Sequence, residues 1–308
     1  IKYYKGLGTS TSKEAQEYFK NIDKLTVGFT KDETTDNSII LAFDKKRADD
    51  RKQWLLNTTR DGVDGIEYGN VKNISVTDFI YRDLVNFSLA DMKRSIAHVC
   101  DGLKPSQRKV VFTCFNKNIT DEVKVAQLAA IVSERTSYHH GEVSLQGAIV
   151  NMAQDFVGSG NNINLLLPNG QFGTRLQGGK DSASPRYIFT ELNPITRKIF
   201  ISDDDDVLNY LDDDGLKIEP EFYVPIIPTV LINDIQGIGT GFSTKIPCFN
   251  PIEIIEYIQN KIEGKDKIKL RPWYKGFKGK IKKLSKDAFL VKGTHEIYDG
   301  KVIITELP

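Results

Sequence analysis

Tyr187 is a candidate nucleophile. It lies in the stretch SPRYIFTEL, residues 184–192, directly after Arg186. Tyrosine is a poor nucleophile at neutral pH because its phenol has an ordinary pKa of about 10. A reacting tyrosine therefore needs nearby cations that stabilise the phenolate and a phosphorane-like transition state. On a strand, Arg186 and Tyr187 would point to opposite faces, so they converge only if the backbone is irregular there. A tyrosine packed in the core is the alternative.

A long loop precedes this tyrosine and is rich in glycine. Residues 161–185 read NNINLLLPNGQFGTRLQGGKDSASP. Long loops inside compact domains are uncommon unless they are functional. Glycine lets the backbone approach a ligand closely, and the nearby cations Arg175, Lys180 and Arg186 are suitable donors to a phosphate. The loop therefore predicts phosphate contact, with a solvated connection as the alternative.

Further cationic and imidazole groups lie at two separate points of the chain. The stretch KRSIAHVCDGLKPSQRK offers Arg94, Lys104 and Arg108. The stretch SYHHGEVS offers Tyr138, His139 and His140, just before a helix predicted to begin at Glu142. Buried histidines with satisfied hydrogen bonds are the alternative for this pair.

Helices must position most of these groups. The capping box from Thr11 to Glu14 predicts an early helix, and the charged segment 43–54 predicts another. Further helical segments follow at 75–100, 104–117, 121–136 and 142–158, and the strand-like run RYIFTEL comes after the loop. Short helices followed by strands are the ingredients of a winged helix-turn-helix, a fold that commonly docks on duplex DNA.

The remainder of the chain, from Asn193, is rich in β-branched and aromatic residues broken by turns, with one amphipathic helix at 250–264. It indicates a mixed α/β domain. The acidic stretch SDDDDVLNYLDDDG, residues 202–215, is interpreted as an exposed loop around a short helix. Basic residues gather at 265–286, where a solvated face is the simplest interpretation.

Bulk composition sets limits on the class of protein. The 308 residues carry 42 basic and 41 acidic side chains, so the net charge of +1 does not itself announce a polyanionic partner. Three cysteines without CxxC spacing argue against a disulfide framework and a structural zinc site. There is no initiator Met, signal peptide or membrane-spanning apolar run, so we expect a soluble internal piece of a larger protein.

Five motifs in order along the chain carry a family resemblance. They are YYKGLGTSTSKEAQEYF, DGLKPSQRKVVFTCF, VKVAQLAAIVSERTSYHHGE, GQFGTRLQGGKDSASPRYIFTEL and PIIPTVLINDIQGIGTGFSTKIP. Together they resemble the breakage-reunion region of the eukaryotic-type (type IIA) DNA topoisomerase II family, over essentially the whole chain. Large DNA viruses share these motifs.

The resemblance implies roles for particular residues. Tyr187 would attack a DNA phosphodiester to give a 5′-phosphotyrosyl enzyme, with Arg186 stabilising the transition state and His140 positioning or activating the reacting groups. The cations that would surround the scissile phosphate are Arg94, Lys104 and Arg108. The implied DNA contacts are Lys45, Lys46, Lys104, Tyr138 and Ser144, and Ile238 would insert between base pairs to bend the duplex. An ordinary core residue is the alternative for Ile238.

The resemblance also implies the architecture, which is α/β, or more fully α+β multidomain. Residues 1–74 would be the end of a Toprim domain with a connector, 75–192 a winged-helix (CAP-like) domain, and 193–308 an incomplete mixed α/β tower domain. We expect Mg²⁺ ligands in a Toprim segment and an ATP-binding module that are both missing here, with no metal site in this chain. The family further implies double-stranded DNA as partner, a homodimer, no membrane, and a nuclear or viral location.

Two other readings compete with an ATP-dependent topoisomerase. In one, the chain is a non-catalytic winged-helix module that bends DNA, and Tyr187 only packs. In the other it is a tyrosine recombinase, which would link its tyrosine to the 3′ phosphate instead. Because the family's metal motif is missing, we expect the chain alone to bind DNA but to cleave it poorly or not at all.

Overall fold

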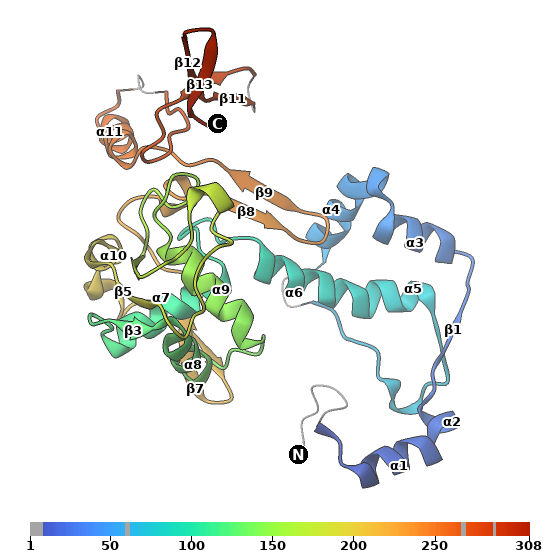
Figure 1. Cartoon of the computed structure of the whole chain (residues 1–308). Coiled ribbons are helices and arrows are strands. Elements are labelled where there is room, and N and C mark those ends of the chain that lie inside the picture. The colour runs from blue at the N-terminus through green and yellow to red at the C-terminus, as the bar shows by residue number, and fades with distance from the viewer. Residues whose placement is uncertain (1–8, 59–61, 266–268, 286–287) are drawn as a thin grey trace. The chain divides into compact units, whose positions relative to one another are not determined.

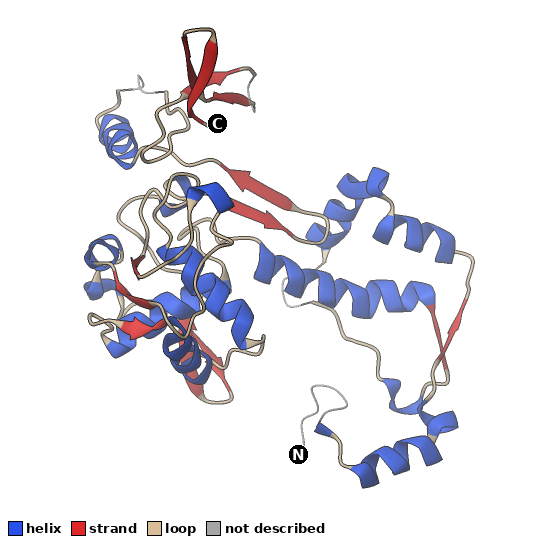
Figure 2. Ribbon diagram, viewed as in Figure 1, coloured by secondary structure: helices blue, strands red, loops and turns tan. Residues whose placement is uncertain are grey.

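The computed structural model describes residues 9–58, 62–265, 269–285 and 288–308. These residues form helices and several small sheets, which confirms the predicted mixed α/β class (Figures 1 and 2). Two compact units are present: Ile1–Met92 with Gly239–Phe242, and Lys93–Ile238 with Ser243–Pro308. The predicted strand end and glycine turn at the very start of the chain lie outside the described residues.

The first unit begins as its sequence predicts. The Thr11 hydroxyl accepts the Glu14 backbone N–H, and the Glu14 carboxylate accepts the Thr11 backbone N–H at 2.7 Å, which completes the capping box. The elements that follow are α1 (Ser12–Lys20), α2 (Ile22–Leu25), α3 (Thr35–Phe43), and the parallel strands β1 (Gly28–Thr30) and β2 (Asn73–Ser75).

The charged helix predicted over residues 43–54 is wrong as a single element. Helix α3 ends at Phe43, a 3-10 turn occupies Lys45–Arg47, and α4 (Ala48–Asn57) begins afterwards. The break has a local cause, because the Asp44 side chain accepts the Lys46 backbone N–H at 2.9 Å and so caps a new turn.

A continuous helical segment leads out of the first unit. It consists of α5 (Val76–Asp78), a π-helical stretch at Phe79–Leu84 and α6 (Val85–Ser95), close to the predicted span. Asp32 accepts hydroxyl hydrogen bonds from Thr34, Thr35 and Thr77, which ties the start of α3 to α5. The compact units divide after Met92, within this helix. The boundaries at 74/75 and 192/193 remain predictions.

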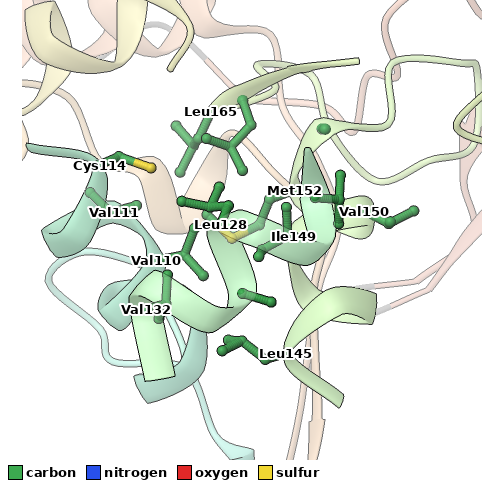
Figure 3. Packing of buried hydrophobic residues seen from close by; sticks show 14 of the residues in the cluster. Val110, Val111, Cys114, Leu128, Val132, Leu145, Ile149, Val150, Met152 and Leu165 are labelled. Carbon is green, nitrogen blue, oxygen red and sulfur yellow. The ribbon is translucent and has the colours of Figure 1, made fainter. Parts of the chain in front are cut away.

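Three helices build the core of the second unit: α7 (Pro105–Lys117), α8 (Val125–Arg135) and α9 (Glu142–Ala153). Their apolar faces meet in a cluster of fully or nearly buried side chains (Figure 3). Each such side chain stabilises the fold by about 1.5–3 kcal/mol relative to an exposed one. The labelled members in Figure 3 are Val110, Val111, Cys114, Leu128, Val132, Leu145, Ile149, Val150, Met152 and Leu165.

A small antiparallel sheet completes this part of the unit. Strand β5 (Phe189–Leu192) lies between β3 (Val123–Lys124) and β4 (Leu166–Asn169), with Thr190 opposite both Val123 and Pro168. Three helices and this sheet are the ingredients that the sequence predicted for a winged helix-turn-helix. The strand begins only at Phe189, so Arg186 and Tyr187 lie outside it.

The rest of the second unit is made of hairpins and one long helix. The expected amphipathic helix is α11 (Pro251–Ile262). The other elements are α10 (Pro194–Ile199), β6 (Tyr210–Asp213), β7 (Leu216–Pro220), β8 (Ile235–Ile238), β9 (Ser243–Ile246), β10 (Lys280–Lys283), β11 (Phe289–Lys292), β12 (Thr294–Tyr298) and β13 (Lys301–Glu306). Sequential pairing in antiparallel hairpins accounts for β6–β7, β8–β9, β10–β11 and β12–β13.

The interpretation of the acidic stretch needs correction. Residues 202–215 do contain a short 3-10 turn at Ser202–Asp204, but their second half is strand β6, paired with β7. The stretch is therefore half of a hairpin. Asp214 and Gly215 both adopt positive φ at its tip, which lets the chain reverse there.

Candidate functional site

Tyr187 lies on a turn and faces solvent. Residues 185–187 form the turn, and the Tyr187 backbone N–H donates to the Ser184 carbonyl at 2.9 Å. Its side chain is 77% exposed, whereas the next residue, Ile188, is buried. Arg186 is exposed as well. The irregular backbone removes the strand alternation that would have separated the two side chains, and Tyr187 is not a core residue.

The start of α8 holds this turn in place. The backbone N–H of Val125 donates to the Ile188 carbonyl at 3.1 Å, and that of Ala126 donates to the Pro185 carbonyl at 3.0 Å. The first amides of a helix have no partner within the helix, so the turn satisfies two of them. The carbonyls on either side of Arg186 and Tyr187 are thereby anchored, while both side chains stay exposed.

The glycine-rich loop beside the turn is closely packed. Gly173 and Gly179 cross so tightly that a Cβ on Gly173 would lie 2.6 Å from the Gly179 Cα. The Gln154 side chain, from just beyond α9, donates to the Phe172 carbonyl at 2.8 Å. The Asp181 carboxylate accepts the Thr174 backbone N–H and hydroxyl, both at 2.8 Å, and these hydrogen bonds lower the pKa of Asp181. The loop is thus held in a defined conformation by close packing and hydrogen bonds.

The three cations expected to serve a phosphate have different surroundings. Arg175 donates to the Leu307 carbonyl at 2.9 Å and forms an ion pair with Glu306, so it ties the loop to the end of β13. Lys180 and Arg186 are exposed. Among the contacts that the described residues make, Arg175 is the one of these three cations whose charged group already has protein partners.

At the start of α7, Lys104 is half-exposed, whereas Arg108 is buried and paired. Lys104 is the N-cap residue, its backbone N–H donates to Gln107 Oε1 at 2.9 Å, and Pro105 follows at the first helical position. Arg108 is buried, and its guanidinium donates to the two Asp101 carboxylate oxygens at 2.7 and 3.0 Å and to the Leu103 carbonyl at 2.9 Å. Arg94 is exposed in the last turn of α6.

Asp101 is the residue of this site that the sequence reasoning missed. Its carboxylate also accepts the backbone N–H of Leu103 and of Tyr223, at 2.9 Å each, and its carbonyl accepts the Thr229 hydroxyl. Asp101 and Arg108 therefore brace the segment that presents Lys104. The available signal was an acidic residue placed seven positions before an arginine in DGLKPSQR.

The histidine pair separates in the structure. His140 meets the Tyr138 ring edge-on at a centroid distance of 5.5 Å, and the Tyr138 hydroxyl donates to Ser144 Oγ at 3.4 Å. His139 instead lies 3.6 Å from an Asp213 carboxylate oxygen on β6. The structure therefore groups Tyr138, His140 and Ser144, three of the predicted residues, at the start of α9.

The remaining predicted DNA contacts are exposed. Lys45 and Lys46 lie in the 3-10 turn of the first unit. Ile238 ends β8 in the second unit, opposite Ser243, and is 75% exposed. Ile238 is therefore not a core residue, and its insertion between bases remains a prediction.

The acidic stretch engages protein partners. Asp205 pairs with Arg197, and Asp212 accepts the Gly215 backbone N–H. Among the described residues, no group of three His, Cys, Asp or Glu side chains is arranged to hold a metal ion. In the same part of the chain, no helix has the length and apolar character needed to cross a membrane.

Comparison with known proteins covers the whole chain. The A-subunit family of DNA gyrase/topoisomerase IV matches residues 94–308, and the C-terminal associated domain of TOPRIM matches residues 1–92. The chain is 52% identical to DNA topoisomerase 2 of Caenorhabditis elegans and 51% identical to DNA topoisomerase 2-alpha of Rattus norvegicus, in both cases over 319 aligned residues. All of this chain aligns, but it spans only 21% of each relative.

A solved structure is also similar. It is the DNA-binding, cleavage and re-ligation domain of Plasmodium falciparum topoisomerase II, with a TM-score of 0.81 and 47% sequence identity. The similarity covers 100% of this chain and 42% of that one.

Proposed function

Because this chain belongs to the type IIA DNA topoisomerases and matches the breakage-reunion region of the eukaryotic enzymes, we propose that it cleaves a gate duplex through Tyr187. One observation carries the proposal: the Tyr187 side chain is 77% exposed on a turn anchored by α8, beside an exposed arginine. A tyrosine that only packs would not be held outward in this way.

The proposed step is a transesterification. The Tyr187 phenol oxygen attacks the phosphorus, a tyrosyl O–P bond forms, and the bond from phosphorus to the 3′ oxygen breaks. The phenol loses its proton to a nearby base or water, and the 3′ oxygen leaves as a hydroxyl after gaining one. One phosphoester replaces another, so the reverse reaction can reseal the strand without a further energy source.

We propose roles for the surrounding residues that agree with the exposure of their side chains. Arg186 would stabilise the charge that develops on the phosphate, and Arg94 and Lys104, which are exposed and half-exposed, would contribute further positive charge. Arg108 is better suited to positioning, because Asp101 already occupies its guanidinium. His140, held against Tyr138, is the proposed proton-handling or positioning group.

Binding of the duplex would use contacts to phosphates and one apolar side chain inserted between bases. Lys45, Lys46, Lys104, Tyr138 and Ser144 are the proposed contacts, and they carry little sequence information because phosphates are alike along DNA. Ile238 would unstack a base step, and the resulting bend would let the duplex contact more protein surface.

The cofactors, assembly and location are proposals from the family. The described residues show no ligand set that fits Mg²⁺, so no step of the mechanism is assigned to a metal held by this chain. We propose that the longer protein uses Mg²⁺ and ATP bound elsewhere, relaxes and decatenates DNA as a homodimer, and works in the nucleus or at a site of viral replication.

The first prediction tests the nucleophile in a full-length protein that contains this chain. The protein is incubated with Mg²⁺ and end-labelled duplex DNA, and the reaction is quenched with detergent. The protein attached to the 5′ and to the 3′ ends of the cleaved strands is then measured. Tyr187→Phe should abolish attachment to the 5′ end, because the attacking oxygen is gone. Tyr298→Phe removes another exposed tyrosine hydroxyl and should leave attachment unchanged.

Other outcomes would point elsewhere. Attachment that survives Tyr187→Phe would show that another residue is the nucleophile, and no attachment in the wild type would favour the DNA-bending module. Attachment to the 3′ end would place the chain's chemistry with tyrosine recombinases.

A further inference from the structure

A groove lies between the segment that leads into β6 and the segment that follows β7. Its volume is about 310 Å³, and its lining residues are Asp204, Val207, Leu208, Asn209, Glu221, Phe222 and Val224. All of them belong to the second unit. None is among the residues that the proposed cleavage reaction uses.

The walls of the groove are apolar and open to solvent. Val207 is 78% exposed and Val224 is 53% exposed, while Leu208 and Phe222 are half-buried behind them. Single exposed apolar residues are ordinary on a protein surface. Several exposed apolar residues that line one groove are unusual, and such patches commonly mark sites of protein interaction.

The rim of the groove is acidic. Asp204 and Glu221 lie on it, and two further exposed acids, Asp203 and Asp206, lie close to Asp204 in sequence. Within the part of the chain that the structure describes, neither Asp204 nor Glu221 forms an ion pair, whereas the neighbouring Arg197 is already engaged by Asp205. The rim therefore carries uncompensated negative charge, which repels DNA and attracts cations.

The backbone around the groove is preorganised. The Glu221 backbone N–H donates to the Asn209 carbonyl at 2.9 Å, which extends the β6–β7 pairing to the groove. The Tyr210 hydroxyl donates to the Asp205 carbonyl at 2.9 Å, and the Val207 backbone N–H donates to the Asp204 carbonyl at 3.0 Å. A partner would thus meet a formed surface, which lowers the entropy cost of binding.

We propose that this groove docks a short basic segment of a partner protein, with an apolar side chain in the groove and Lys or Arg residues against the rim. The apolar walls require an apolar anchor, and the unpaired carboxylates require flanking cations. A basic peptide meets both conditions at once, and a nucleic acid meets neither.

The test uses fluorescein-labelled octapeptides of the form KRKXXKRK and the 308-residue chain. The two X positions are Leu, Val, Phe or Trp in four probes, Ser in a fifth, and fluorescence anisotropy measures binding. We expect at least one apolar probe to bind and the serine probe to bind at least about tenfold more weakly, because burial of the anchor contributes most of the affinity.

Two double variants separate the two contributions. Val207→Ser with Val224→Ser should weaken the best apolar probe by about tenfold. Asp204→Asn with Glu221→Gln should weaken it by about three- to tenfold at low salt and flatten its salt dependence. Ile262→Ser and Glu256→Gln make single changes of the same two kinds at exposed positions of α11 and should leave binding unchanged.

Several results would overturn the proposal. They are failure of every apolar probe to bind the wild-type chain, equal binding of the serine probe, and equal effects of the groove variants and their α11 controls. A groove variant that instead changes self-association in sedimentation would identify a second copy of the chain as the occupant.

Discussion

At the scale of single residues, side chains of the same type differ in burial within this site. Arg186 and Arg108 are both arginines expected near the scissile phosphate, yet Arg186 is exposed and Arg108 is enclosed with Asp101. An enclosed ion pair whose guanidinium donates three hydrogen bonds serves to hold a segment in place. An exposed guanidinium next to a tyrosine in the sequence is accessible to a ligand.

The second prediction follows from this contrast. Arg108→Ala should lower the free energy of unfolding by about 3–5 kcal/mol, because it leaves the buried Asp101 carboxylate without its cation. Arg186→Ala should change it by less than about 0.5 kcal/mol, as is usual for an exposed side chain. Urea denaturation followed by circular dichroism measures both. Equally small effects would show that the pair does not brace the Lys104 segment.

At the scale of elements, the loop and the turn depend on glycines that allow two backbone segments to cross. Gly173 has φ +98°, and a Cβ there would meet the backbone of Gly179 at 2.6 and 2.7 Å. Gly178 also has a positive φ, +59°, but a Cβ there would meet nothing within 4 Å. Both positions have a positive φ, but only Gly173 is crowded, and its φ also lies further from the left-handed region that other residues tolerate.

The third prediction uses this matched pair. Gly173→Ala should cost about 1–3 kcal/mol more in unfolding free energy than Gly178→Ala, because the backbone of Gly179 has to move. Thermal unfolding of the two variants measures the difference. In the full-length enzyme, Gly173→Ala should also slow attachment to the 5′ end. Equal stability of the two variants would mean that the loop relaxes easily and does not support the turn.

At the scale of the whole molecule, charge is separated although the total is near neutral. The net charge is only +1, yet Lys45 and Lys46 are exposed cations in one turn, and the 202–215 stretch carries a run of acids. Affinity for DNA then depends on local cationic groups, whose binding releases counterions from the duplex.

The fourth prediction concerns the salt dependence of DNA binding. Lys45→Gln with Lys46→Gln should reduce the slope of log affinity against log salt by about 2, since each phosphate contact contributes about 0.9. Lys20→Gln with Lys24→Gln removes two exposed charges from α1 and α2 and should leave the slope unchanged. A slope that both pairs reduce equally would point to nonspecific attraction.

Local patterns in the sequence were enough to predict several features. They include the capping box at Thr11, the Lys104–Pro105 helix start, the apolar faces of α7 to α9 and the mixed α/β class. They also include the order of motifs that indicated the family. Caps, proline positions and apolar spacing act over a few residues, so they are visible in the chain itself.

Only the tertiary structure decided how the site residues are used. Tyr187 faces outward because amides at the start of α8, some 60 residues earlier, hold its turn. Arg108 is buried because Asp101 also binds the Tyr223 backbone, 122 positions away, and Arg175 is occupied by the Leu307 carbonyl, 132 positions away. Residue type and spacing do not specify such distant partners, since packing of the core decides which segments meet.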